Sequence, residues 1–374
     1  MINWISDNQQ LQDLYQQLKP VTAIAVDTEF IRTNTFYSQL ALIQLSDGQD
    51  CWLIDALSID SWQPLKELLE AHEKVLVFHA CAEDLEVLSH ALSISPENIF
   101  DTQIAAGIAN VGYSMGYARL VSALLNIELD KHETRSDWLT RPLTEEQEKY
   151  AVEDVLYLHQ LYQQLSDKLK EQQREQWNMD ETDALLHQVD NRNSIQDYYL
   201  RVKGAWQLKR ESLAALKRLC IWRETTARRR DKPRSRILKD STLLDIALRL
   251  PTQIQQLYGI ADFYPKAVKK IGPDVISEVV NSFDDPLPES LPKPLPKAAG
   301  TIMKEIRTEL GKTAENASIP PELLCNKKEL ESILRSELEG DIMWPKRLAT
   351  GWRATLVKPV IERVLERSDI GIGA

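Results

Sequence analysis

The chain has 374 residues, of which 43% are hydrophobic, and its 45 Lys and Arg against 56 Asp and Glu give a net charge of −11. At roughly 150 residues per domain, this length predicts two or three domains. No apolar run approaches the ~20 residues that span a bilayer, the start MINWISDNQQ lacks a secretory signal, and the four cysteines form no CxxC pair, so we expect a cytoplasmic protein without disulfides or a zinc site.

The first 92 residues alternate short apolar segments with amphipathic ones. Apolar, partly β-branched runs at 21–29, 38–46, 51–56 and 74–80 predict strands, and the apolar spacing within 61–72 and 82–92 predicts helices. Three strands in a meander, followed by helix, strand and helix, predict a mixed α/β sheet with helices packed on it.

Residues 141–177 have the pattern of one long helix. Thr144 and Gln147, three residues apart after Pro142, predict a capping box at its start. Tyr150 and Asp154 are four residues apart, so both lie on the same helix face.

Beyond residue 195 the strand patterns disappear. Residues 205–280 and 298–370 both have helical patterns, and the segment between them contains five prolines from 286 to 296, which is typical of a stiff interdomain spacer. Residues 1–170 carry 11 basic against 26 acidic residues (net −15), whereas 201–239 carry 14 against three (net +11). A basic cluster of this density attracts polyanions, although a solvated helix surface is the alternative.

Four acidic residues occupy positions where a charge is costly. Asp27 ends an apolar run and is followed by Glu29, Asp84 begins the helix after another apolar run, and Asp154 lies on the late helix. A buried charge costs several kcal/mol unless it is paired or bound to a metal, an order-of-magnitude figure. Residues i and i+2 of a strand project from the same face, so Asp27 and Glu29 form a pair of oxygen ligands of the kind that favours Mg²⁺ or Mn²⁺.

Several stretches together resemble the exonuclease motifs of the DEDD superfamily. They are VDTEF, HACAEDLEVL with FDTQIA after it, and SDWLTRPLTEEQEKYAVEDVLYL, in which Tyr150 marks the DEDDy branch. Over almost the whole length, the chain resembles the bacterial ribonuclease D family. Residues from Trp206 to Ala247 resemble an HRDC (helicase and ribonuclease D C-terminal) domain, and residues after Glu322 resemble a second one more loosely.

The resemblance implies a fold and a domain order. We expect a ribonuclease H-like α/β exonuclease domain with a mixed five-stranded sheet over 1–170 and a helical linker over 171–204. A first, basic HRDC helical bundle over 205–285, a Pro-rich linker over 286–297 and a second HRDC-like bundle over 298–374 would follow.

The resemblance also implies an activity. Asp27, Glu29, Asp84 and Asp154 would bind two divalent metal ions at the scissile phosphate, and Tyr150 would orient the attacking water with help from Glu29. The enzyme would be a monomeric 3′–5′ exoribonuclease that releases nucleoside 5′-monophosphates while trimming tRNA precursors and other small structured RNAs. The alternatives are a DNA 3′–5′ exonuclease of the same superfamily and a non-catalytic nucleic-acid-binding scaffold.

Contacts with RNA are predicted on two parts of the chain. Phe30, Phe36 or Tyr37, close after Asp27, are candidates to stack on terminal bases, with packing inside the protein as the alternative. Arg135 and Arg141 are candidates to meet a phosphate, with ion pairs to Glu133 or Glu145 as the alternative. In the basic cluster, Arg228, Arg229 and Arg230 are expected to hold the RNA body by its phosphates.

Overall fold

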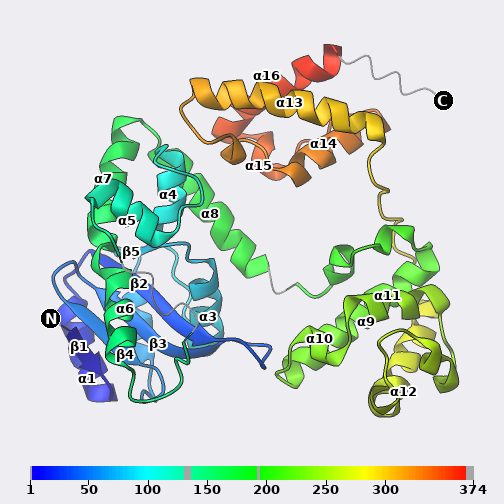
Figure 1. Ribbon diagram of the computed structural model, residues 1–374, viewed down its shortest axis with the longest axis horizontal. Coiled ribbons are helices and arrows are strands. Elements are labelled where there is room, and N and C mark those ends of the chain that lie inside the picture. Colours follow the sequence, from blue (N-terminus) through cyan, green and yellow to red (C-terminus); the bar gives the residue numbers. More distant parts are fainter. Residues whose placement is uncertain (1, 130–135, 192–193, 368–374) are drawn as a thin grey trace. The chain divides into compact units, whose positions relative to one another are not determined.

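The computed structural model describes residues 2–129, 136–191 and 194–367, and Arg135 lies outside these ranges. The chain forms two compact units, of which the first contains residues 1–30, 40–188 and 295–374 and the second contains residues 31–39 and 189–294. Figure 1 shows the elements of both units. The first unit carries the sheet, and the second is helical.

The first unit is built on a mixed sheet in the order β1-β4-β3-β2-β5-β6. β1 pairs in parallel with β4, β2 with β5, and β5 with β6, whereas β3 and β4 are antiparallel. The strands are β1 (Ile2–Ile5), β2 (Ala23–Ile31), β3 (Gln39–Ser46), β4 (Cys51–Asp55), β5 (Val75–Phe78) and β6 (Ile99–Asp101). β2, which carries the first acidic residues, is therefore an inner strand whose Ile24, Ala25 and Val26 are fully buried.

The described residues form six strands, so the expectation of five was wrong. The two edge strands, β1 and β6, have only four and three residues, too few to show a period of two. They exist because a neighbour pairs with them: Ile2 to Ile5 pair with Cys51 to Ile54, and Ile99 to Asp101 pair with Leu76 to Phe78. Pairing across the sheet therefore added a strand that the local pattern did not predict.

Helices connect and cover the strands. Those before residue 126 are α1 (Asn8–Leu18), α2 (Gln63–Leu69), α3 (Ala82–Leu92), α4 (Thr102–Ile108) and α5 (Tyr117–Leu125). Side chains of α4 and α5 pack with Val77 of β5 and Phe100 of β6 in one buried apolar cluster. This packing fixes the two strands that follow β2 in the sheet.

The long helix expected over 141–177 is divided into α6 (Glu145–Leu156), α7 (Leu158–Glu171) and the start of α8 (Glu175–Asn191). The predicted capping box of Thr144 and Gln147 is confirmed. The break at Tyr157 has a visible cause: the Tyr117 hydroxyl donates to the Glu153 carbonyl (2.8 Å) and accepts from the Tyr157 amide (3.2 Å). A side chain has thus inserted into the i→i−4 ladder, which separates α6 from α7.

The C-terminal helices belong to the same compact unit as the sheet. They are α13 (Lys297–Asn316), α14 (Lys327–Glu339), α15 (Lys346–Ala349) and α16 (Gly351–Arg367). Arg174, just before α8, donates to the carbonyls of Ile108 (2.7 Å), Ala317 (2.5 Å) and Ser318 (3.0 Å). The rings of Trp177 and Trp352 stack with centroids 4.3 Å apart. One arginine and one ring stack therefore fasten this region to α4 and α8.

The second unit is a helical bundle with its own core. Its helices are α9 (Arg210–Arg229), α10 (Arg234–Ile237), α11 (Asp240–Arg249) and α12 (Pro265–Asn281), with short 3₁₀ turns at 198–201, 205–207, 254–259 and 282–284. Residues 31–39, which connect β2 to β3, pack within this unit rather than with the sheet. Among the described residues, no helix has the length and apolar character needed to cross a membrane.

Candidate active site

The site begins on β2, where a charged pair follows a buried apolar run. Asp27 and Glu29 are separated by one residue and are half-buried, whereas Thr28 between them is buried. Alternation along the strand places the two carboxylates on one face. The carboxylate oxygens of Asp27, Glu29 and Asp154 come within 4.8 Å of one another.

Helix α6 supplies Asp154 and Tyr150, one turn apart. The capping box fixes its first turn, and the Tyr117 hydroxyl ends it three residues after Asp154. The Tyr150 hydroxyl is hydrogen-bonded to the Asp154 carboxylate. The predicted pairing of these two residues on a common helix face is therefore present in the structure.

Asp84 lies beside the group of three rather than within it. It occupies the first turn of α3, as predicted, and its side chain is 8% exposed. The Thr28 hydroxyl donates to Asp84 Oδ1 at 2.5 Å. Asp84 is nevertheless near enough for its charge to raise the pKa of Asp27 and of Glu29.

Burial is the main cause that raises the pKa of each of the four carboxyl groups, and repulsion from nearby carboxylates adds to it. Burial, followed by repulsion from Asp154 and Asp84, raises the pKa of Glu29 to about 9. Burial raises the pKa of Asp154 to about 7 and that of Asp84 to about 6, and hydrogen bonds from Tyr150 and Thr28 partly oppose these shifts. The pKa of Asp27 is raised by burial and then by repulsion from Asp84 and Asp154. Without a cation, the four groups thus resist ionising together.

A divalent cation fits this set of donors. The principal causes of the four pKa shifts include no Lys or Arg of the described residues. Hard oxygen ligands converging from β2, α3 and α6 are the ligands that Mg²⁺ and Mn²⁺ prefer. His79, a neighbouring residue of a type that can bind zinc, has its ring nitrogens 2.9 Å from Thr102 Oγ1 and 3.0 Å from the Met115 carbonyl oxygen. It is thus a packed, hydrogen-bonded histidine.

Three positioning residues were not singled out from the sequence: Thr28, Asp101 and Tyr117. Asp101 caps α4 and accepts the backbone N–H groups of Ala80 (3.2 Å) and Cys81 (2.9 Å) just before α3, so it fixes the turn that presents Asp84. An Asp-Thr pair before a helical pattern is an N-cap signal that sequence reasoning can find. The inserted hydroxyl of Tyr117 leaves no such signal.

The predicted RNA-contact residues have different surroundings. Phe36 is buried beneath the guanidinium groups of Arg228 and Arg234, so packing, the alternative to base stacking, holds for this ring. Tyr37 lies edge-on to Phe36, and Phe30 is half-buried on β2.

The arginines also differ in their partners. Arg141 is ion-paired with Asp55 (2.7 Å), which the sequence did not predict, and Glu133, one of the partners considered there, lies outside the described residues. Arg228 is ion-paired with Glu224 (3.1 Å), whereas Arg229 and Arg230 are exposed at the end of α9.

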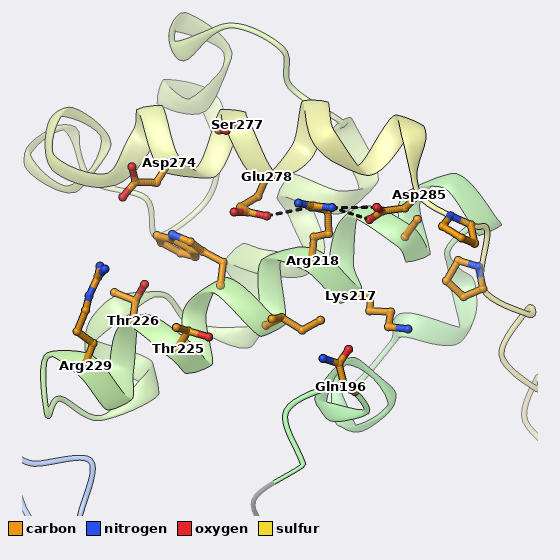
Figure 2. Close-up of a pocket in the computed structure, with 15 residues that line it drawn as sticks. Gln196, Lys217, Arg218, Thr225, Thr226, Arg229, Asp274, Ser277, Glu278 and Asp285 are labelled. Carbon is orange, nitrogen blue, oxygen red and sulfur yellow. Dashed lines mark hydrogen bonds and ion pairs between the residues drawn. The ribbon is translucent and has the colours of Figure 1, made fainter.

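A cavity of about 750 Å³ lies between α9 and α12. Figure 2 shows Arg218 bonded to Glu278 and Asp285 at one end, and Arg229 and Asp274 at the other. Its charged lining consists of three cations and three anions: Lys217, Arg218, Arg229, Asp274, Glu278 and Asp285. This balance does not favour a chain of phosphates, so the exposed end of α9 is the better candidate for contact with a polyanion.

Comparison with known proteins gives consistent matches. Residues 2–170 match the family described as 3′-5′ exonuclease, and residues 212–279 match the HRDC domain. Ribonuclease D of Pseudomonas paraeruginosa (strain DSM 24068 / PA7) is 38% identical over 98% of both chains, and ribonuclease D of Shewanella sp. (strain ANA-3) is 35% identical over 95% of this chain and 92% of that one. The crystal structure of Escherichia coli RNase D, an exoribonuclease involved in structured RNA processing, superposes with a TM-score of 0.88 at 30% identity, covering 98% of this chain and 99% of that one.

Proposed function

Because the chain belongs to the ribonuclease D family and is a 3′–5′ exoribonuclease, we propose that it trims tRNA precursors and other small structured RNAs, releasing one nucleoside 5′-monophosphate at a time. The observation that carries the catalytic part is the meeting of Asp27, Glu29 and Asp154 within 4.8 Å, with Asp84 beside them. The substrate part is supported by the solved relative, which is an exoribonuclease involved in structured RNA processing.

The four carboxylates would hold two divalent ions, Mg²⁺ or Mn²⁺. When bound, such a pair lowers the pKa of water and neutralises charge on the attacking and leaving oxygens. The chain supplies the four carboxylates, and a bound cation neutralises their charge. Thr28 orients Asp84 for this purpose, and Tyr150 orients Asp154.

Tyr150 acts by positioning rather than by removing a proton. Burial and the nearby carboxylates raise the pKa of its phenol above the usual 10, so the hydroxyl remains protonated at neutral pH. Its proton is directed to Asp154, which leaves the oxygen lone pairs to accept a hydrogen bond from the attacking water. Glu29 would accept the second hydrogen bond of the same water, and together they would fix its direction of attack.

The helical part would hold the body of the RNA. We assign 1–170 to the exonuclease domain, 171–204 to a helical linker, 205–285 to the first HRDC domain, 286–297 to a Pro-rich linker and 298–374 to a second HRDC-like domain of a monomeric enzyme. Arg229 and Arg230 are the proposed phosphate contacts because both are exposed at the end of α9. Arg228 is left out because Glu224 and Phe36 engage its guanidinium.

A digestion time course tests the proposal. A tRNA precursor labelled at its 5′ end, incubated with Mg²⁺ or Mn²⁺, should give a ladder that shortens from the 3′ end and stops near the mature terminus. The released product should be nucleoside 5′-monophosphate. DNA of the same sequence serves as the matched control, and equal or faster digestion of that DNA would overturn the assignment to RNA.

The Arg229→Ala/Arg230→Ala double variant tests the docking surface. We expect weaker RNA binding and a slope of log affinity against log salt that is shallower by roughly 1 to 2, since each phosphate contact contributes about 0.7 to 0.9. Lys269→Ala/Lys270→Ala on α12 is the control, because it removes two exposed positive charges outside the proposed docking surface. An unchanged affinity and slope in the Arg229/Arg230 variant would remove this surface from the proposal.

A further inference from the structure

The end of α9 contains an aspartate where glycine is the usual residue. Asp231 follows the last helical residues with φ of +46°, in the left-handed region. Its N–H donates to the Arg228 carbonyl (3.2 Å) and that of Lys232 to the Ala227 carbonyl (3.0 Å), the two bonds of a Schellman motif. Glycine adopts this conformation without steric cost and aspartate at a smaller cost than most residues, so an aspartate can end the helix and still offer a side chain for another contact.

The side chain of Asp231 binds the backbone of the β2–β3 connection. Its Oδ1 accepts the N–H groups of Phe36 (2.9 Å) and Tyr37 (3.1 Å). Lys232 Nζ donates to the Asn34 carbonyl at 3.4 Å. A carboxylate that accepts two backbone N–H groups makes charge-assisted bonds, which are stronger than neutral ones.

Two arginines cover the ring of Phe36 at the same place. The guanidinium carbons of Arg234 and Arg228 lie 4.6 Å and 5.6 Å from the ring centroid. Glu224, whose side chain is 2% exposed, forms ion pairs with both arginines and thereby fixes their guanidinium groups. The buried Phe36 ring is thus held by cation–π contacts from groups that cannot move away freely.

From these contacts we infer that residues 31–39 are an anchoring arm: the segment that directly follows the strand with Asp27 and Glu29 is held by the first HRDC bundle. Only Phe30 separates Glu29 from residues 31–39, which pack with that bundle. Asp231 is the central residue of the anchor because it binds the backbone of the arm and also ends α9. Three basic residues near it, Arg228, Lys232 and Arg234, therefore hold the protein's own chain rather than RNA.

The anchor has a consequence for substrate binding, which rests on the proposed role of Arg229 and Arg230. These residues directly precede Asp231, so through the anchor only the short stretch of chain from Phe30 to Phe36 connects the RNA-docking surface to Glu29. Two linked binding sites reinforce each other only while their separation is held within reach. Loss of the anchor should weaken binding of a long RNA and leave hydrolysis of a dinucleotide unchanged.

Two substitutions of Asp231 separate the anchor from the helix end. Asp231→Gly keeps the left-handed conformation and removes both hydrogen bonds to the arm, whereas Asp231→Asn keeps an acceptor oxygen and is tolerated in that conformation. Hydrogen exchange of the full chain is followed in the peptides that contain Phe36 and Tyr37. We expect these two amides to exchange roughly tenfold faster or more in Asp231→Gly and near the wild-type rate in Asp231→Asn. If the amides of Phe36 and Tyr37 exchange at the wild-type rate in Asp231→Gly, the proposed anchor is wrong.

Enzyme kinetics then test whether the anchor at Asp231 supports binding of a long RNA. For Asp231→Gly we expect kcat and KM on an RNA dinucleotide to be unchanged and KM on a structured RNA to rise roughly tenfold or more. If exchange is faster but this KM is unchanged, the coupling is wrong. The Arg229→Ala/Arg230→Ala variant separates the docking surface from the anchor. If Arg229 and Arg230 bind RNA, this variant should bind RNA more weakly, while the amides of Phe36 and Tyr37 exchange at the wild-type rate. If they do not bind RNA, its affinity for RNA should be unchanged.

Discussion

Replacing Glu29 by Gln should stabilise the metal-free protein while it weakens the metal site. At pH 7 the wild-type side chain is ionised in the unfolded chain, where its pKa is 4.5, but it is held protonated in the folded chain, where burial and the neighbouring carboxylates raise the pKa to about 9. Each pH unit between 4.5 and the working pH costs about 1.4 kcal/mol. The 2.5 units to pH 7 therefore amount to about 3 kcal/mol, which Gln does not incur because it never ionises.

The sign of the pH dependence follows from the raised pKa. Below pH 4.5 both states of the wild-type chain are protonated at Glu29, so the variant and the wild type should be equally stable. As pH rises toward 9, the unfolded wild-type chain gains ionisation free energy that the folded chain does not, and its stability falls relative to Glu29→Gln. The advantage of the variant should thus be below about 1 kcal/mol at pH 5 and about 3 kcal/mol at pH 7.

Thermal unfolding in EDTA, followed by calorimetry at pH 5 and pH 7, measures this difference. For a folding unit of this size, 3 kcal/mol corresponds to a rise in Tm of roughly 6–12 °C at pH 7. Glu171→Gln, an exposed position at the end of α7, removes the same charge outside the cluster and is the control. A Glu29→Gln variant with no gain at pH 7, or with the same gain at pH 5, would refute the argument that burial and repulsion keep Glu29 protonated.

Three further substitutions have expected outcomes. Tyr150→Phe should lower kcat roughly 100-fold or more because the phenol positions the attacking water, whereas Mn²⁺ affinity, measured by titration calorimetry, should fall no more than roughly tenfold because one hydrogen bond to Asp154 is lost. Thr28→Val removes the donor to Asp84 and should weaken Mn²⁺ binding roughly tenfold in the same titration, a loss that Thr28→Ser should largely restore. Arg174→Met leaves three carbonyls without their donor, so the C-terminal helices should lose about 3 kcal/mol of stability and exchange faster around Ala317 and Ser318.

The sequence predicted the elements that local patterns specify. The apolar run before Asp27, the first turn of α3 with Asp84 and the capping box of α6 are all present, because each depends on neighbours in the chain. The meeting of Asp27, Glu29 and Asp154 was also predictable, since buried acids without nearby cations indicate a common counter-ion.

Other features depend on contacts between distant residues. Tyr117 breaks a helix forty residues later through its hydroxyl, and nothing in the helical periodicity marks that position. The edge strands β1 and β6 exist through pairing, and Arg174 joins α4 to the C-terminal helices. Phe36 illustrates the same point: an aromatic residue near the site suggested base stacking, but Arg234 and Asp231, almost two hundred residues away, hold that segment.

The catalytic assignment is tested most directly by Mn²⁺ titration of the wild type and of Asp154→Asn, followed by calorimetry, with single-turnover cleavage of RNA measured on the same samples. We expect two ions bound by the wild type, loss of at least one in the variant, and a cleavage rate below detection although the variant remains folded. Wild-type stoichiometry together with wild-type cleavage in Asp154→Asn would contradict the account.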